Sequence, residues 1–454
     1  MNKRKIRVAI THGDTNGIGY ELIFKTFVEP EMLELCTPII YGSPKIAAYH
    51  RKALDLQANF SIINNAEDAR DGRVNLLTCF DEEVKVDMGV PTAESGAAAL
   101  KALDRAMTDY RDNAFDVLVS CPVCNSNMSN EDVHFKTVRH YIQTCIGEGK
   151  EALSIYINDF LRIASATEDL TMKDVAPAIT SDNIISKTKI LFDCMKRDFM
   201  LSEPRVALLG LNPNADGDEE LQVIAPAIKQ MAENGIYAFG PYRSGEFFDG
   251  NQTDAFDGIL AMYDSQASIP FHTLASECGI VYIAGLPLVC TAPSQGPSFS
   301  IAGKGQADET SLRHAIFEAI DIYRNRKNYD EPFANPLQKL YHERRDESEK
   351  ARFSVQKKQD KPELRNKLTI PSKECFDKTK SRIYKKSKPT SKTHQQENKE
   401  NANPTEIVAT NTIEMIAESS VTVKKDDRPD VTTVKTDTHQ SADTESKEIK
   451  KAES

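Results

Sequence analysis

The stretch ITHGDTNGIGYE, from Ile10 to Glu21, follows the mostly apolar run IRVA and places three glycines and an acid after a predicted first strand. Glycines permit a tight turn, and the backbone N–H groups of such a turn can face an anion at the start of a helix. The stretch lacks the G-x-G-x-x-G order of a dinucleotide fingerprint and the Gly-Lys-Ser/Thr ending of a P-loop. We therefore expect it to turn the chain from strand to helix and not to bind a nucleotide.

Apolar runs rich in β-branched residues alternate with helix-like segments through the first 325 residues. Strands are predicted at 6–11, 37–42, 73–78, 116–120, 161–166, 205–211, 258–263 and 279–285. A helix over 95–110 is predicted to have an apolar face made of Leu100, Leu103, Met107 and Tyr110. Its polar face is expected to carry Lys101, Asp104, Arg105 and Asp109. This alternation predicts an α/β fold with parallel sheets covered by helices on both faces.

The chain has 454 residues and a net charge of −11, and its charge is unevenly spread. Single cores stop growing near ~250–300 residues, so more than one lobe is expected. Residues 1–350 hold 35 Lys/Arg against 51 Asp/Glu, which argues against a binder of duplex nucleic acid. Nine scattered cysteines do not form a disulfide framework, and no apolar run approaches ~18 residues. We expect a cytoplasmic protein with no membrane span and no signal peptide.

The composition changes after a predicted helix near 312–329. Residues 351–392 hold 14 Lys/Arg, and 393–454 are rich in small polar and charged residues. Such a segment cannot bury enough apolar surface to offset its chain entropy, so a body over 1–345 and a disordered tail over 346–454 are predicted. The basic part is either an inert extension or a site for an anion such as RNA or DNA. The stretch EIVATNTIEMIAESSVTV, 406–423, either docks on another surface or forms only transient structure.

Four motifs carry polar or reactive side chains near predicted strand ends. CPVC at 121–124 is either a redox pair or two buried small residues, and HFKTVRH at 134–140 is either part of an anion pocket or a solvated loop. NPNADGDEE at 212–220 and YDSQ at 263–266 offer oxygen ligands for a hard cation. The alternative for these two motifs is that they cap the helices that follow.

Together, ITHGDTNGIGYE, GLNPN (210–214), LAMYDSQ (260–266), and GLPLVCTAPSQG followed by AGKGQAD resemble the 4-hydroxythreonine-4-phosphate dehydrogenase (PdxA) family of vitamin B6 synthesis. The resemblance covers about residues 5–325 and leaves the tail unmatched. It implies a two-lobed α/β/α subunit like isocitrate and isopropylmalate dehydrogenases, a central cleft and a homodimer. It also implies NAD- or NADP-dependent oxidation of a phosphorylated hydroxy-amino acid, followed by loss of CO2, with a divalent metal polarising the oxidised oxygen.

The resemblance places the family's three metal-binding histidines at positions where this chain has other residues. These positions are Asp169 (or Glu168, one earlier), Asn214 and Asp264. Oxygen ligands could hold Mg²⁺ or Mn²⁺, but the strong imidazole ligands for zinc-like ions are lost. The resemblance thus implies a divergent member of the family without the metal-binding histidines.

The substrate-binding positions that the resemblance implies are also altered. They fall at Arg139 or His140, at Thr273 beside His272, near Val281 and at Cys290. A family lysine falls at Asn125, and Ser294 and Gln295 replace an Asp-His pair. A phosphorylated substrate needs cations, which valine and cysteine do not supply.

Two functional hypotheses follow from these replacements. The first is a catalytically degenerate member of the family, kept as a binding or regulatory protein, either as a homodimer or as a heterodimer with an active paralogue. The second is an active NAD-dependent and metal-dependent dehydrogenase/decarboxylase that acts on a small hydroxy acid with altered specificity. The residues that would bind the cofactor are not identified from the sequence.

Overall fold

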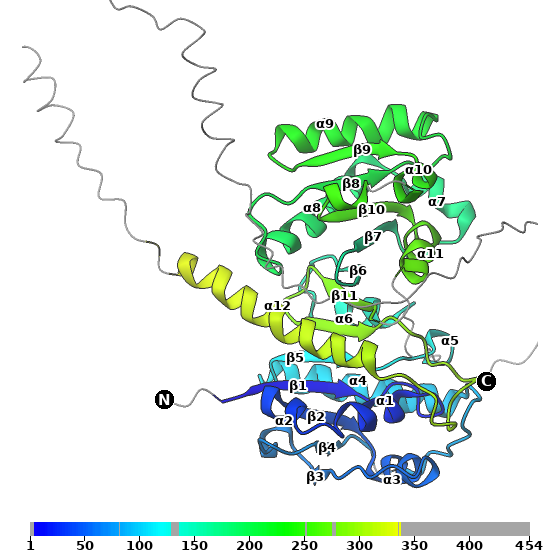
Figure 1. Ribbon diagram of the computed structural model, residues 1–454, viewed down its shortest axis with the longest axis vertical. Coiled ribbons are helices and arrows are strands. Elements are labelled where there is room, and N and C mark those ends of the chain that lie inside the picture. Colours follow the sequence, from blue (N-terminus) through cyan, green and yellow to red (C-terminus); the bar gives the residue numbers. More distant parts are fainter. Residues whose placement is uncertain are drawn as a thin grey trace, which may run out of the picture. The chain divides into compact units, whose positions relative to one another are not determined.

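The computed structural model describes residues 4–80, 82–128, 136–249, 252–274, 278–334 and 336. In this part of the chain twelve strands form one sheet in the order β3-β4-β2-β1-β5-β12-β11-β6-β7-β10-β8-β9 (Figure 1). The predicted tail, with the basic segment 351–392 and the stretch 406–423, lies outside the described residues. No helix of the described part is long and apolar enough to cross a membrane.

The strands are β1 (Ile6–Thr11), β2 (Cys36–Gly42), β3 (Ser61–Ile63), β4 (Asn75–Thr78), β5 (Val117–Ser120), β6 (Leu153–Ile157), β7 (Arg162–Thr167), β8 (Val206–Leu209), β9 (Ala238–Tyr242), β10 (Gly258–Tyr263), β11 (Ile280–Ala284) and β12 (Val289–Pro293). The α-helices are α1 (Gly19–Thr26), α2 (Glu31–Leu35), α3 (Pro44–Ala53), α4 (Ala93–Arg111), α5 (Asn125–Met128), α6 (Val138–Ile146), α7 (Met172–Ala178), α8 (Ser181–Arg197), α9 (Ala225–Glu233), α10 (Ser244–Asp249), α11 (Asp264–Leu274) and α12 (Thr310–Ala334). Two 3-10 helices, η1 (Ala66–Asp68) and η3 (Thr253–Ala255), and a π-helix, η2 (Glu220–Ile224), complete the set in the described ranges.

All eight predicted strands are present within a few residues of their predicted ends, but the prediction of parallel pairing is wrong in the middle of the sheet. There β6 runs antiparallel to β7 and β11, and β11 runs antiparallel to β12. The connections explain this, because both hairpins have short turns and parallel strands need a long crossover. The Asn158 side chain accepts the N–H groups of Phe160 and Leu161 in the first turn, and Gly285 takes a positive φ of 88° in the second.

Helices cover both faces of the sheet, but the two faces are packed differently. Alternate strand residues point to opposite faces. On one face a single apolar cluster runs along the sheet and includes residues of α1, α8, α9 and α12. On the other face there are two separate clusters, one with α4 and α6 and one with α10 and α11. The middle strands therefore lack a continuous helical cover on this second face.

The opening stretch turns β1 into α1 inside the protein, and residues 12–20 are buried. Asp14 accepts hydrogen bonds from the backbone of Asn16 at 2.8 Å, Asn127 Nδ2 at 2.8 Å and Ser95 Oγ at 3.1 Å. Gly13 has a φ of 74°, and a Cβ there would overlap the carbonyl oxygen of Pro122. The polar groups of the loop are thus engaged within the protein, where they fix α4 and the segment after β5 to the end of β1.

One residue of the predicted polar face of α4 points inward. Asp109 is buried, accepts a hydrogen bond from the Tyr41 hydroxyl at 2.9 Å and pairs with Arg105 at 2.9 Å. A buried carboxylate is tolerated because both oxygens have partners. The helical pattern alone did not reveal this pair, since Tyr41 lies on β2.

Helix α12 crosses the middle of the sheet (Figure 1). A buried ion pair between Arg326 and Asp198 anchors it. The Arg326 guanidinium donates to Asp198 at 2.7 Å, to the Tyr282 hydroxyl at 2.6 Å and to the carbonyl oxygens of Leu286 and Pro287 at 3.0 and 2.9 Å. These partners belong to the end of α8, to β11 and to the turn before β12. The Arg326 side chain therefore links α12 to the end of α8, to β11 and to the turn before β12.

Replacing Arg326 by Met is expected to lower the free energy of unfolding by about 3–5 kcal/mol, because the buried carboxylate of Asp198 loses its cation. Urea unfolding followed by circular dichroism measures this change. The control is Arg324→Met on the same helix, where the exposed pair with Asp321 is removed. Its effect should stay within about 0.5 kcal/mol. Equal effects of the two substitutions would contradict the importance of the buried pair.

The same fold buries His12 completely, and among the described residues neither ring nitrogen has a hydrogen-bond partner. Its ring stacks on Tyr20 with 5.3 Å between the ring centroids. Burial lowers the pKa of His12 from 6.5 to about 4. The unfolded chain therefore takes up a proton at a higher pH than the folded chain, and this favours unfolding as the pH falls from 6.5 towards 4.

Between pH 7 and pH 5, His12 should reduce the free energy of unfolding by about 2 kcal/mol, at ~1.36 kcal/mol per pKa unit. In His12→Leu this part of the pH dependence should be absent. Urea unfolding at the two pH values tests it, with exposed His272→Leu as the control for removing an imidazole. An unchanged pH dependence in His12→Leu would show that the imidazole is not responsible.

Candidate functional site

A pocket of about 280 Å³ lies on the middle strands, on the face where the apolar clusters are split. Its floor is formed by Ser154 and Tyr156 of β6, Val281 and Ile283 of β11 and Ala292 of β12. Its walls come from the segment after β5, the start of α6, the end of β7, the start of α11 and the loop after β12. Pockets between two packed groups of helices commonly bind ligands in α/β proteins.

The strand pattern explains why these side chains face the pocket. In β6, Leu153, Ile155 and Ile157 belong to the continuous cluster, so Ser154 and Tyr156 point to the opposite face. The register pairs Tyr156 with Val281 and Ser154 with Ile283, which places the four side chains side by side. The antiparallel centre of the sheet therefore builds the pocket floor.

Arg139 forms two ion pairs at the wall of this pocket. Thr137 Oγ1 accepts the N–H of His140 at 3.4 Å and caps α6, which begins at Val138, so Arg139 lies in the first turn. Its Nη2 lies 2.5 Å from Asp169 Oδ2 and its Nε lies 3.1 Å from Glu168 Oε2. The three side chains are only 10 to 26% exposed. One guanidinium is thus shared between two largely buried carboxylates.

The carboxylates shape the electrostatics of the pocket. Burial raises the pKa of Glu168, although Arg139 and Lys187 act in the opposite direction. Burial also raises the pKa of Tyr156, and the neighbouring carboxylate of Asp264 adds to this effect. Among the described residues that line the pocket, Glu168, Asp169 and Asp264 are the acids and Arg139 is the base. The lining is therefore net negative, which is unfavourable for a phosphate group.

The structure brings together two of the three predicted metal positions. Asp169, which takes a positive φ of 61°, and Asp264 at the start of α11 both line the pocket. Asn214 is exposed in the loop after β8 and does not line it, and its carbonyl oxygen accepts a hydrogen bond from Arg243 Nε at 2.9 Å.

These donors do not fit the divalent metal that the family resemblance implies. Asp169 already has Arg139 as its cation, and no group of three or more His, Cys, Asp or Glu side chains in the described ranges could hold a metal ion. A second positive charge beside a guanidinium is repelled at such short range.

Only some of the predicted substrate-binding residues line the pocket. Arg139 and Val281 line the pocket, whereas His140, Thr273 and Cys290 are not part of its described lining. Thr273 is exposed and donates to the carbonyl oxygen of Ile269, and Cys290 is buried in β12, where burial raises its thiol pKa to about 12. Only one cation therefore remains at these positions inside the pocket.

The motifs CPVC and HFKTVRH differ in part from their predicted environments. Cys121 is buried and Cys124 is half-buried beside Ser126, so the prediction of two buried residues is half right. In HFKTVRH, residues 138–140 begin a helix, which makes the prediction of a solvated loop wrong for them, and His134 lies outside the described residues. Asn125 and Gln295 line the pocket.

In NPNADGDEE, the acids make local contacts and do not face the pocket. Asn212 donates from its backbone to Glu220 at 2.7 Å and from its side chain to Glu219 at 2.9 Å. These bonds close the loop before the π-helix η2. They do not show a cation site. Asp264 of YDSQ is the first residue of α11, and the alternative that this motif caps the helix stays a prediction.

The sequence reasoning missed Tyr156 and Ser154, the two polar residues of the pocket floor. The signal was present in LSIYI, where polar and apolar residues alternate as in a half-buried strand.

Comparisons with known proteins agree with the fold and place the chain in a family. The model of the family described as "Pyridoxal phosphate biosynthetic protein PdxA" matches residues 34–319. The 4-hydroxythreonine-4-phosphate dehydrogenase of Bacteroides thetaiotaomicron is 47% identical over 360 residues, which cover 78% of this chain and 99% of that protein. The enzyme of the same name from Sulfurihydrogenibium sp. is 30% identical over 71% of this chain and all of its own length.

A solved structure shows the same fold. The 4-hydroxythreonine-4-phosphate dehydrogenase of Klebsiella pneumoniae superposes with a TM-score of 0.60 at 22% identity, over 70% of this chain and 100% of that one. The predicted α/β fold is therefore confirmed. With a family model that matches most of the described body, and a relative 47% identical over nearly its whole length, this chain belongs to the PdxA family.

Proposed function

We propose that this chain keeps the PdxA fold but has lost the family's metal-dependent dehydrogenase reaction, and that it acts as a binding or regulatory protein. One observation carries the proposal: the Arg139 guanidinium is paired with both Glu168 and Asp169 at a predicted metal position. We further propose that its partner is a second family subunit, either an identical chain or an active paralogue.

The chemistry of the reaction explains why this pairing matters. An alkoxide that forms before hydride transfer needs a Lewis acid or a positioned donor worth several kcal/mol of the barrier. In the pocket, Asp169 is paired with the Arg139 guanidinium. Unlike a metal ion, a guanidinium cannot accept a lone pair from the substrate oxygen. At the three positions where the resemblance places the family's imidazoles, this chain has Asp169, Asn214 and Asp264.

The residues that line the pocket give a second argument for the proposal. A substrate phosphate is normally held by several cations or N–H donors. Arg139 is the one base among the described lining residues, and both of its ion pairs are with protein carboxylates. Thr273 lies outside the lining and Val281 offers no donor side chain.

The purified full-length chain should form no reduced nicotinamide from 4-phosphohydroxythreonine with NAD⁺ or NADP⁺ in Mg²⁺, Mn²⁺ or Zn²⁺. Absorbance of the reduced cofactor measures this, with the Bacteroides thetaiotaomicron relative as positive control. Metals should leave the melting temperature unchanged, whereas a ligand at a hundred times its Kd adds about 2.7 kcal/mol of stability.

Metal-dependent formation of reduced cofactor would instead support an active dehydrogenase/decarboxylase with altered specificity. The 47% identity to the Bacteroides relative supports family membership, and for this reason we keep an active dehydrogenase as the second candidate. In that case Asp264→Ala should abolish the activity, since Asp264 would be needed as a metal ligand. Activity that survives this substitution would exclude Asp264 as an essential metal ligand.

Removing the cation should restore affinity for metals. Arg139→Gln is expected to lower the free energy of unfolding by about 2 kcal/mol, because two largely buried carboxylates lose their partner. Mn²⁺ should then raise the melting temperature of this variant but not that of the parent chain. Arg70→Gln, at an exposed site without an ion pair among the described residues, is the control. If Mn²⁺ does not stabilise Arg139→Gln, the guanidinium is not what keeps metal out.

A further inference from the structure

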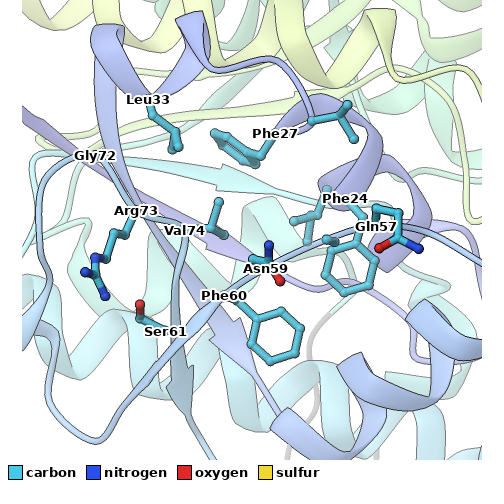
Figure 2. Close-up of a pocket in the computed structure, with 13 residues that line it drawn as sticks. Phe24, Phe27, Leu33, Gln57, Asn59, Phe60, Ser61, Gly72, Arg73 and Val74 are labelled. Carbon is cyan, nitrogen blue, oxygen red and sulfur yellow. The ribbon is translucent and has the colours of Figure 1, made fainter.

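A second pocket, of about 490 Å³, lies between α1, α2 and the segments 57–61 and 72–74 (Figure 2). It is at the end of the sheet where β3 is the edge strand, and it shares no lining residue with the site on the middle strands. Its volume is in the range of small-molecule sites in proteins. The pocket is therefore a separate candidate for binding a ligand.

The middle of this pocket is apolar and aromatic. Phe27 and Leu33 face it from the α1–α2 side, and Phe60 and Val74 from the opposite side. The rings of Phe24 and Phe60 are stacked, with 6.1 Å between their centroids. Pairs of aromatic rings gain energy beyond the area that they bury. These side chains therefore suit a ligand with an aromatic ring.

Polar side chains that have no partner lie around the aromatic middle. Gln57, Asn59 and Arg73 are exposed, and Ser61 is half-buried. Within the described part, none of these four side chains makes a hydrogen bond or an ion pair. Figure 2 shows Arg73 and Ser61 towards one end of the pocket and Gln57 towards the other. A guanidinium and a hydroxyl are both donors, so the first end suits an acceptor such as a carboxylate.

The charge of the lining also favours an anion. Arg73 is the charged residue of the described lining, which contains no Asp or Glu. Arg51 does not line the pocket, but its guanidinium lies 5.6 Å from the centre of the Phe60 ring and adds positive charge nearby. The body as a whole is acidic, with 35 Lys/Arg against 51 Asp/Glu over residues 1–350. This pocket therefore differs in charge from the average surface and from the site on the middle strands.

We propose that this pocket binds a small organic anion made of an aromatic ring and one carboxylate. The ring packs between Phe27 and Phe60, and the carboxylate accepts hydrogen bonds from Arg73 and Ser61. One carboxylate matches the one guanidinium of the lining, whereas a phosphate is normally held by several cations or N–H donors. The proposal goes beyond the proposed function and does not depend on the loss of dehydrogenase activity.

Phenylacetate is a suitable probe, because saturation-transfer difference NMR on its phenyl protons measures binding to the full-length chain. We expect a Kd on the order of 1 mM, since a ligand of about ten heavy atoms in a pocket open to solvent gains little energy per atom. Arg73→Gln should weaken binding roughly fivefold, which is the effect of an ion pair near solvent. Arg70→Gln, at an exposed position three residues away that does not line the pocket, should leave binding unchanged.

Two matched ligands separate the contribution of the charge from that of the ring. Phenylacetamide keeps the ring but has no charge, so it should bind roughly fivefold more weakly than phenylacetate and should not respond to Arg73→Gln. Cyclohexylacetate keeps the charge but has no aromatic ring, and it should bind severalfold more weakly than phenylacetate.

Three outcomes would overturn the proposal. One is the absence of saturation transfer to phenylacetate at concentrations well above the expected Kd. Another is binding that Arg73→Gln leaves intact, with the fold verified by circular dichroism. If that binding is lost in Arg139→Gln, the probe occupies the site on the middle strands. The third is equal affinity for cyclohexylacetate and phenylacetate, which would show that the pocket does not select an aromatic ring.

Discussion

The buried ion pair between Arg326 and Asp198 holds the centre of the sheet together. It joins α12, the end of α8, β11 and the turn that leads into β12 within one hydrogen-bonded cluster. Tyr282 completes the cluster by donating to Asp198 at 2.6 Å. Because Val281 and Ile283 are the immediate neighbours of Tyr282 on β11, the cluster on one face of the strand fixes the pocket floor on the other face.

Much of the fold could be predicted from the sequence, because long β-branched runs and amphipathic helices are local signals. The eight strands that were predicted correctly are apolar runs rich in β-branched residues. Strand β3 has only three residues, and β9 contains Gly240 and Pro241, so both lack such a signal. The antiparallel middle of the sheet depends on which distant strands become neighbours, and periodicity does not contain that information.

The candidate site was predictable only in part. The sequence pointed to Asp169, Asp264 and Arg139, which line one pocket, but also to Asn214 and Thr273, which do not. The ion pairs of Arg139 depend on Thr137, which begins α6 in the position that brings the guanidinium to the end of β7. The hydrogen bond between Tyr41 and Asp109 could not be predicted from local sequence either, since the two residues are 68 positions apart in the chain.

The tightly packed glycines of the opening turn have a consequence for how this family changes. A side chain at Gly13 or Gly19 would overlap backbone oxygen atoms, whereas Asn125 and Asp264 at the pocket wall are exposed, so a different side chain there meets solvent. The requirement to fold and the requirement to catalyse therefore act partly on separate positions. A descendant can drop one requirement and still satisfy the other, so similarity across the scaffold is a record of ancestry and not of present chemistry.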